Sequence, residues 1–304
     1  MRTLEEKVGA VPGEYRFGAA GDYSIRVAAS IEDRIRAWSL VYRVYREKEY
    51  AVPNEQRLWY GLHDALPGTT TFLVEKRAQD TTAVSAAPST LGLQAAAAVV
   101  PVATLTLVFD SPLGLPAEEV YGPELGSLRA CGRRPCEIVS LVSVEGDLRC
   151  GMEIMKRLFK LAYLVARRLT DATDFLITVN PRHVSFYKRI LLMSELGPER
   201  PYGKVGGAPA VLLGLDLLGA EELYRARYGE EQGSFFRFFV DQVTEPEIVS
   251  RLSRSRRPLG EADLRRFFVE ERPLLFGAGG RHGPNAPAAA LSGTAVRTSD
   301  YAQV

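Results

Sequence analysis

The sequence predicts an α/β fold, and the observations that predict it lie between residues 136 and 192. Residues 136–144 are almost continuously apolar, as expected of a strand buried on both faces. A long amphipathic helix follows over 152–169, and a second apolar strand follows over 175–180. A strand, a crossover helix and a second strand are typical of parallel neighbours in one sheet. We therefore expect this unit at the centre of the fold.

The helix over 152–169 has an apolar side and a mostly cationic side. Met152, Met155 and Phe159 begin a series at steps of three and four, and a second apolar seam runs beside it. The remaining face carries Lys156 and Arg157 among its charged residues. Such a helix packs its apolar side on a sheet.

The segments before this unit are predicted as follows. Residues 1–21 are rich in glycine and charge, and we expect a flexible leader there. Residues 23–28 form a strand, and Ser30 is a suitable N-cap for a helix over 31–50. Two further strands are predicted at 70–75 and 102–109.

Between those two strands, residues 78–98 are rich in Ala, Thr and Ser and predict a mobile insertion. A turn-rich segment then leads to a short helix near 124–130. Residues 204–217 predict a final hairpin, and three helices follow it at 221–227, 245–254 and 261–270. The predicted organisation is a leader (1–21), a main domain (22–218), a helical extension (219–276) and a disordered tail (277–304).

Composition excludes several classes of protein. The net charge of +1 gives no general reason to bind nucleic acid or a membrane. Three cysteines, odd in number and not spaced as in a zinc site, predict neither a disulfide framework nor a bound metal. The charged first ten residues do not resemble a signal peptide, and no apolar run suits a membrane span. We therefore expect a cytoplasmic protein.

Three groups of residues carry a resemblance to a known family. They are Val41–Tyr45 with Glu47 in the first helix, Glu137–Leu141 in the central strand, and Asn180–Tyr187 after the second strand. In order and spacing they resemble the GNAT acyltransferase superfamily, over roughly residues 20 to 216. Within it the chain is most similar to the long-chain N-acyl amino acid synthases of the FeeM type, which are relatives of the LuxI-type autoinducer synthases.

The resemblance implies a fold and an activity. The fold would be a mixed, twisted sheet of six or seven strands with helices on both faces, followed by the helical extension. The activity would be transfer of a long-chain acyl group from an acyl carrier protein thioester to the amine of a free amino acid. The donor would be held through its 4'-phosphopantetheine arm, with no tightly bound cofactor.

Glu137 and Tyr187 are the candidate catalytic residues. A carboxylate inside an apolar strand is costly unless it is paired or used, and burial would raise its pKa toward the range of a base. The resemblance places the strand glutamate of the autoinducer synthases on Glu137; the alternative is a salt bridge to Arg133 or Arg134. Tyr187 matches the tyrosine that in many GNAT enzymes protonates the departing thiolate, so the resemblance implies this role for it, although a tyrosine there is also an ordinary packing residue.

The resemblance also assigns the donor site to the end of the central strand. Its predicted contacts with pantetheine are Leu141, Val142, Ser143, Val144, Arg149, Gly151 and Asn180. The turn over 145–151 has few glycines and carries two acidic residues, so it is poorly suited to a pyrophosphate. This favours an acyl carrier protein over coenzyme A as the donor.

The remaining predicted residues serve the acceptor and the carrier. The acceptor and acyl pocket is assigned to Arg43, Tyr45, Asp64 and Ser140, with Arg43 suited to a carboxylate. Ser140 stands where the autoinducer synthases have an arginine. Carrier docking is assigned to the cations Arg129, Arg133, Arg134, Lys156 and Arg157, for which a solvated basic surface is the alternative.

Two other functions stay open at this point. One is an acyl-CoA-dependent N-acyltransferase that acts on a small amine or on a protein. The other is a GNAT-fold module that binds an acyl ligand or a partner without catalysis.

Overall fold

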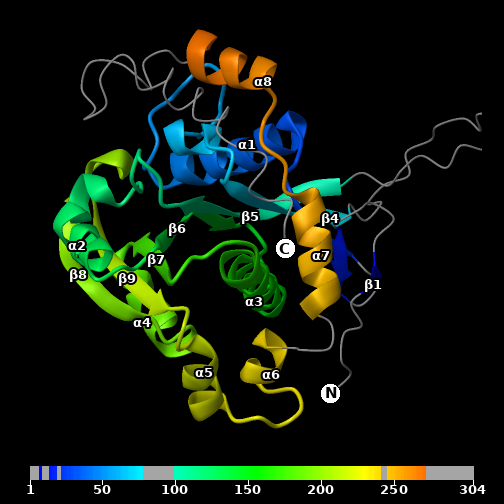
Figure 1. Cartoon of the computed structure of the whole chain (residues 1–304). Coiled ribbons are helices and arrows are strands. Elements are labelled where there is room, and N and C mark those ends of the chain that lie inside the picture. The colour runs from blue at the N-terminus through cyan, green and yellow to red at the C-terminus, as the bar shows by residue number, and fades with distance from the viewer. Residues whose placement is uncertain (1–6, 9–13, 19–21, 78–98, 241–244, 272–304) are drawn as a thin grey trace, which may run out of the picture.

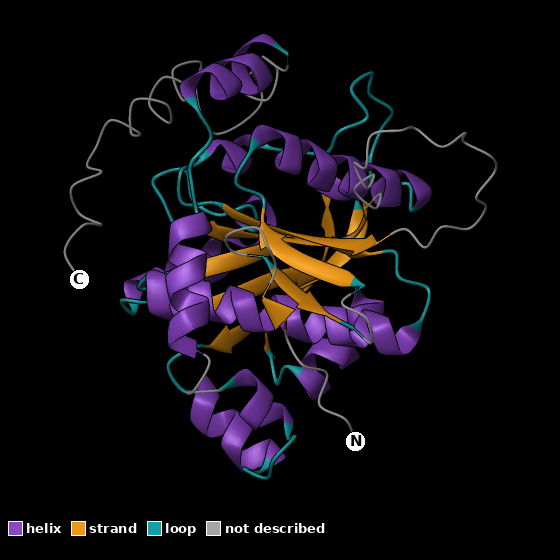
Figure 2. Ribbon diagram, turned by 90° about the vertical axis from the view of Figure 1, so that its right-hand side faces the viewer, coloured by secondary structure: helices purple, strands orange, loops and turns teal. Residues whose placement is uncertain are grey.

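The computed structural model describes residues 7–8, 14–18, 22–77, 99–240 and 245–271. Within these residues, nine strands form one mixed sheet, with helices on both of its faces (Figure 1, Figure 2). Neighbouring strands are antiparallel except β6 and β7, which are parallel. The strands in their order across the sheet are β1 (Lys7–Val8), β2 (Tyr15–Phe17), β3 (Tyr23–Val27), β4 (Thr70–Arg77), β5 (Val99–Phe109), β6 (Pro135–Ser143), β7 (Asp174–Val179), β9 (Ala208–Asp216) and β8 (Ser194–Tyr202).

The described helices belong either to the main domain or to the extension. The helices of the main domain are α1 (Ile31–Glu47), α2 (Glu118–Ala130), α3 (Leu148–Leu164, continued by a π-helical turn over Val165–Leu169) and α4 (Pro181–Ile190). The extension holds α5 (Ala220–Tyr228), α6 (Phe235–Phe239), α7 (Glu245–Ser255) and α8 (Glu261–Arg265), which a π-helical turn over Arg266–Glu270 continues. In Figure 1 α1 and α3 lie on opposite sides of the sheet, and α8 lies on the outer side of α1.

The predicted fold class is confirmed: the sheet is mixed, helices cover both faces, and helices follow the last hairpin. The sheet has more strands than the six or seven expected, because the predicted leader supplies β1 and β2 at one edge. Phe17 in β2 is buried and stacks on Tyr23, with ring centroids 5.2 Å apart. The predicted insertion at 78–98 and the tail at 277–304 lie outside the described residues.

Strand β6 separates the two layers residue by residue. The side chains of Cys136 and Ile138 belong to the core under α3, together with Phe175 and Ile177 of β7. Glu137 lies between them in the sequence and therefore points to the face that α1 and α2 cover. This alternation puts the carboxyl group of Glu137 into the layer of α1 and α2.

Helix α3 begins at Leu148, four residues before the predicted start at 152. Asp147 caps it, because its Oδ1 accepts a hydrogen bond from the Cys150 amide over 2.8 Å. Both apolar seams are used, since Ile154, Leu158 and Ala162 are fully buried against the sheet. No helix of the described residues is long and apolar enough to cross a bilayer.

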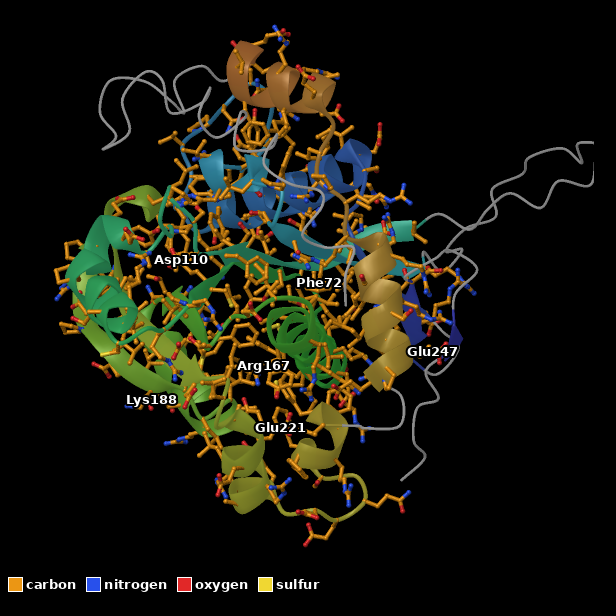
Figure 3. The ribbon with its side chains drawn as sticks, viewed as in Figure 1. Phe72, Asp110, Arg167, Lys188, Glu221 and Glu247 are labelled. Atoms are coloured by element: carbon orange, nitrogen blue, oxygen red, sulfur yellow. The ribbon has the colours of Figure 1, made fainter. Side chains whose placement is uncertain are left out.

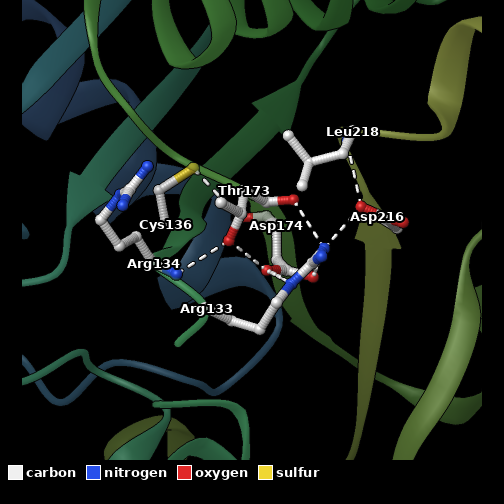
Figure 4. A network of polar contacts seen from close by, with 7 residues as sticks. All are labelled: Arg133, Arg134, Cys136, Thr173, Asp174, Asp216 and Leu218. Carbon is white, nitrogen blue, oxygen red and sulfur yellow. Dashed lines mark hydrogen bonds and ion pairs between the residues drawn. The ribbon is translucent and has the colours of Figure 1, made fainter. Parts of the chain in front are cut away.

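Arg133, which lies just before β6, connects the start of β7 with the end of β9 (Figure 4). Its guanidinium binds Asp174 at the start of β7 over 2.7 Å and also Asp216 at the end of β9. The Arg134 amide donates to the Thr173 hydroxyl, and its Nε donates to the Asp171 carbonyl. These contacts hold β6 beside β7 at one end, which matters because the two strands part at the other.

Candidate active site

The parallel pair β6–β7 opens halfway along its length. The two strands pair from Pro135 with Asp174 to Ile138 with Ile177, although β6 continues to Ser143 and β7 to Val179. The register of β6 on β5 shifts between Thr104 and Thr106, which marks a bulge in β6. Ser140 lies in that bulge with a φ of 51°. The bulge bends β6 away from β7 and leaves its backbone groups free to bind a ligand.

A cavity of about 410 Å³ occupies this opening. Its volume falls within the usual range of small-molecule sites. The walls come from α1, the loop before β4, strands β6, β7 and β9, helices α3 and α4, and the turn between β8 and β9. The lining residues are Val44, Tyr45, Lys48, Tyr50, Trp59, Gly61, His63, Asp64, Val108, Pro116, Glu137, Ile138, Val139, Ser140, Leu141, Val142, Ser143, Met152, Met155, Ile177, Thr178, Val179, Asn180, Arg182, His183, Phe186, Tyr187, Tyr202, Lys204, Val205, Ala208, Pro209 and Ala210.

Glu137 is the buried acid of this cavity. Its side chain is 1 % exposed, and its Oε2 accepts a hydrogen bond from the Ala117 amide over 2.7 Å. Burial raises the pKa of Glu137 to about 7, against the opposite effects of the Ala117 amide and of the positive charge of Lys204. A carboxyl group with this pKa can accept a proton at neutral pH and release it again.

Tyr187 reaches the cavity from α4. It is 8 % exposed, and its ring packs edge-on against Phe159 and Phe186, with centroids 6.2 and 5.2 Å away. Burial raises the pKa of Tyr187 far above its usual value, so the phenol keeps its proton. Glu137 and Tyr187 thus line one cavity.

Tyr45 brings a second, half-buried tyrosine from α1. Its ring contacts Tyr50 and Trp59 edge-on, with centroids 5.7 and 5.0 Å away. Burial and the nearby Tyr50 raise the pKa of Tyr45 to about 12. The phenol of Tyr45 is therefore uncharged at neutral pH.

Most of the residues predicted to hold pantetheine lie along the opening. Leu141, Val142, Ser143 and Asn180 line the cavity. Val144 and Arg149 are exposed and Gly151 is half-buried, and these three lie outside the cavity lining, at the end of β6 and in the first turn of α3.

The two acidic residues of the turn before α3 have different partners. Asp147 is the helix cap already described, and the hydrogen bonds from Cys150 lower its pKa. Glu145 pairs with Lys76 over 2.9 Å and accepts a hydrogen bond from the Tyr23 hydroxyl over 2.7 Å. Burial raises the pKa of Glu145, but these two contacts outweigh it and the net shift is downward. Both carboxylates are therefore negative, and one already occupies the α3 N-terminus.

The structure separates the residues predicted for the acceptor. Tyr45, Asp64 and Ser140 line the cavity, whereas Arg43 is exposed and lies outside the lining. The reason is the helical period: Val41 and Val44 face the sheet, which turns Arg43 toward solvent.

Asp64 is held by its own chain. Its Oδ1 accepts a hydrogen bond from Trp38 Nε1 over 3.1 Å, and its Oδ2 accepts one from the Gly61 amide over 2.8 Å. Burial raises its pKa, while the Gly61 amide and the charges of Arg34 and Lys204 lower it. Asp64 thus shapes the loop beside the cavity, with both oxygens engaged.

Each of the five cations predicted to dock a carrier already contacts a partner within the chain. Arg129 binds Asp110 over 2.7 Å, and Asp110 lies next to α2 (Figure 3). Arg133 binds Asp174 and Asp216, as Figure 4 shows, and the Nε of Arg134 donates a hydrogen bond to the Asp171 carbonyl. Lys156 and Arg157 both bind Glu153, over 3.0 and 2.6 Å.

Arg157 is also covered. It is 7 % exposed, and its guanidinium lies over the rings of Phe17 and Phe238, 4.7 and 5.5 Å from their centroids. The sequence predicts an open cationic face on α3, but β2 and the segment around α6 bury this part of it. Lys156, about one-third exposed, keeps contact with solvent.

Sequence reasoning missed several residues of the cavity, among them Trp59, Tyr202 and Lys204. Lys204 lies in the turn Gly203–Val205 between β8 and β9. The glycines around it were a signal for a hairpin tip, but no local pattern tells which way a hairpin tip points.

Comparison with known proteins adds family evidence. Residues 76–216 match the family model described as N-acyl amino acid synthase FeeM. The structure of FeeM, an N-acyl amino acid synthase from uncultured soil microbes, matches with 21 % identity and a TM-score of 0.53, covering 67 % of this chain and 96 % of that one. This likeness shows a shared, GNAT-like fold.

Two further solved structures match more weakly. An N-acetyltransferase from Staphylococcus aureus Mu50 matches with 14 % identity and a TM-score of 0.39, covering 64 % of this chain and 98 % of that one. The AHL synthase LasI matches with 16 % identity and a TM-score of 0.41, covering 64 % of this chain and 90 % of that one. None of the curated protein sequences matches the chain.

Proposed function

Through residues 76–216 the chain belongs to the family of the N-acyl amino acid synthase FeeM, and from this premise we propose that it transfers a long-chain acyl group from an acyl carrier protein to a free amino acid. The acyl group leaves a thioester on the 4'-phosphopantetheine arm of the carrier. The amine of the amino acid receives it and becomes an amide.

One observation supports the proposal above the others. A single cavity is lined both by Glu137, from the layer of α1 and α2, and by Tyr187, from the layer of α3 and α4. Between them runs the part of β6 that no longer pairs with β7. Acyl transfer to an amine needs a base, an acid and a donor to the carbonyl oxygen, and this cavity contains groups suited to each role.

The proposed chemistry uses these groups in turn. Glu137 takes a proton from the acceptor amine as the nitrogen attacks the thioester carbon. A backbone N–H of β6 beyond Ile138 stabilises the negative charge on the carbonyl oxygen. The C–S bond breaks as the C–N bond forms, and Tyr187 gives its proton to the departing thiolate. Glu137 then returns its proton to solvent, and Tyr187 regains one.

The N-terminus of α3 supports a carrier protein as the donor. Coenzyme A carries a pyrophosphate, which binds well to free amides at a helix N-terminus. Here the negatively charged Asp147 already accepts the hydrogen bond of the Cys150 amide. The arm of a carrier protein carries a single phosphodiester and therefore needs fewer free backbone amides at this site.

The apolar part of the cavity supports a long acyl chain. Met152 and Met155 of α3, Phe186 of α4 and Leu141 of β6 line it together. Methionine side chains adapt to flexible apolar ligands because they are unbranched and polarizable. An acetyl group would leave most of this surface unfilled.

The test compares cells that express the wild-type protein with cells that express Glu137→Gln. Lipid extracts from both are analysed by mass spectrometry, and purified protein is assayed with a long-chain acyl carrier protein, the matching acyl-CoA and acetyl-CoA. We expect N-acyl amino acids in the wild-type extract alone and the highest kcat/KM with the carrier protein. Equal use of acetyl-CoA, or a purified protein without turnover of any donor, would contradict the proposal.

A further inference from the structure

The tip of the β8–β9 hairpin is fixed over the cavity. The Tyr202 hydroxyl donates a hydrogen bond to the Pro116 carbonyl over 3.1 Å, which ties the hairpin to the segment before α2. Gly206 and Gly207 have φ values of 69° and 78°, in the left-handed region that favours glycine. The Gly207 amide closes the turn by donating to the Tyr202 carbonyl over 2.9 Å. Lys204 therefore has a defined backbone position.

The ammonium of Lys204 lies beside the loop that carries Asp64. Its Nζ is 3.8 Å from the position that a Cβ on Gly61 would occupy, and the Gly61 amide itself donates to Asp64. Among the described residues Lys204 has no ion-pair partner, and its side chain is exposed to the cavity and to solvent. An accessible cation at a cavity wall is suited to an anionic part of a ligand.

Lys204 also acts on the acid of the site. Its positive charge lowers the pKa values of both Glu137 and Asp64, so its ammonium lies within electrostatic reach of both carboxyl groups. Of the other cations of the cavity, Arg182 contributes to lowering the pKa of Lys48, and both contribute to lowering the pKa of His183. Lys204 is thus the lining cation whose charge is felt by Glu137.

An α-amino acid fits this arrangement because its amine and its carboxylate are attached to the same carbon. If the amine faces Glu137, the carboxylate lies only a few ångströms away and needs a cation there. Arg43, which the sequence suggests for this role, is outside the cavity, and Ser140 carries no charge. Lys204 has the required charge and the required neighbours.

We propose that Lys204 binds the α-carboxylate of the acceptor. The enzyme thereby prefers amino acids to amines that lack a carboxylate. The assignment rests on the proposed function, because it places the acceptor amine at Glu137. Binding by one ammonium also predicts that a neutral carboxamide in place of the carboxylate is a poor acceptor.

The experiment uses one pair of acceptors and four proteins. The acceptor is the L-amino acid that wild type acylates best among the twenty, and its partner is the α-carboxamide of that amino acid. The proteins are wild type, Lys204→Met, Lys204→Arg and, as a matched control, Lys188→Met, which removes an exposed lysine of α4 outside the cavity. KM and kcat are measured for each acceptor, and melting temperatures verify that each variant folds.

We expect wild type to prefer the amino acid over the carboxamide. In Lys204→Met the KM for the amino acid should rise about 10- to 100-fold, the usual effect of losing a hydrogen bond to a charged group, with a much smaller change for the carboxamide. Lys204→Arg should keep most of the preference, and Lys188→Met should match wild type.

Two results would overturn the assignment in different ways. An unchanged KM ratio in Lys204→Met, with product still formed, removes Lys204 from recognition and leaves the proposed function intact. A wild type that acylates neither acceptor removes the proposed function and the role of Lys204 with it.

Discussion

The buried carboxylate of Glu137 accepts a hydrogen bond from the amide of Ala117, 2.7 Å away, and so joins the centre of β6 to the residue before α2. One carboxylate oxygen is held by the backbone, while the side chain still faces the cavity. This contact keeps the acid in place whether or not it carries a proton. It also makes the glutamine variant a clean test, because a glutamine oxygen can accept the same hydrogen bond.

Glu137→Gln should lower kcat roughly 10²- to 10⁴-fold, the usual scale of general-base catalysis. In wild type kcat should rise with pH as the carboxyl ionises around pH 7 and then level off. The variant should lack this step and gain activity only at higher pH, where the acceptor amine loses its proton unaided. The exposed Glu119→Gln is the control, and near wild-type kcat in Glu137→Gln would exclude Glu137 from the mechanism.

Glu137 should make the stability of the protein fall as pH rises, whereas it makes kcat rise. Its pKa is 4.5 as an ordinary value and about 7 when buried, so between these values the folded state binds more protons than the unfolded state. The free energy of unfolding therefore falls as pH rises through this window, by on the order of 3 kcal/mol from this group alone. Melting temperatures between pH 4 and pH 8 should fall less for Glu137→Gln than for wild type, and parallel curves would contradict this.

Tyr187→Phe should reduce kcat and leave stability almost unchanged. The phenyl ring keeps its edge-on contacts with Phe159 and Phe186, whereas the proton for the thiolate is lost. General-acid catalysis is typically a factor of about 10² or more. Single-turnover assays and calorimetry would separate the two effects, and a loss of melting temperature with unchanged kcat would mean that the hydroxyl serves packing.

Asp147→Asn should improve the use of acyl-CoA relative to the acyl carrier protein. Asparagine also caps helices, so α3 keeps its first turn, but the negative charge beside the donor's phosphates is removed. A charge at a helix end has a modest effect on binding, so kcat/KM for acyl-CoA should rise by about two- to fivefold. The measurement uses one acyl chain on both donors, and a lower preference for acyl-CoA than in wild type would reject the electrostatic argument.

Phe268→Ala should loosen the extension and, through it, the acceptor wall. Phe268 is fully buried and packs edge-on against Trp38, with centroids 6.1 Å apart, and the Trp38 indole donates to Asp64 beside the cavity. Removing a buried phenyl ring costs about 3–5 kcal/mol. Hydrogen exchange should show lost protection over 261–270, together with a higher KM for the acceptor. Val269→Ala, at a side chain that is 41 % exposed, should change neither the protection nor the KM. An unchanged KM in Phe268→Ala would show that the extension does not affect acceptor binding.

The sequence predicts the centre of the fold well because local patterns determine it. Nearly continuous apolar runs mark β6 and β7, the helical period marks α3, and Ser30 indeed caps α1 through the amide of Asp33. Each of these signals lies within a few residues of the element that it forms. The extra strand β2 gave no comparable signal, because its three residues form a strand only when Tyr23 and its neighbours pair with them.

By itself the sequence determined that a strand, a crossover helix and a strand would bring the carboxyl group of Glu137 into the otherwise apolar central strand of a sheet that helices cover on both faces. The tertiary structure alone decided which charges remain available to a ligand. Arg157 is covered by Phe17 and Phe238, which lie 140 and 81 residues away in the chain, while Lys204 reaches a cavity whose acid comes from β6. Burial and ion pairing depend on contacts between distant segments, and such contacts leave no periodic signal near the residue that they change.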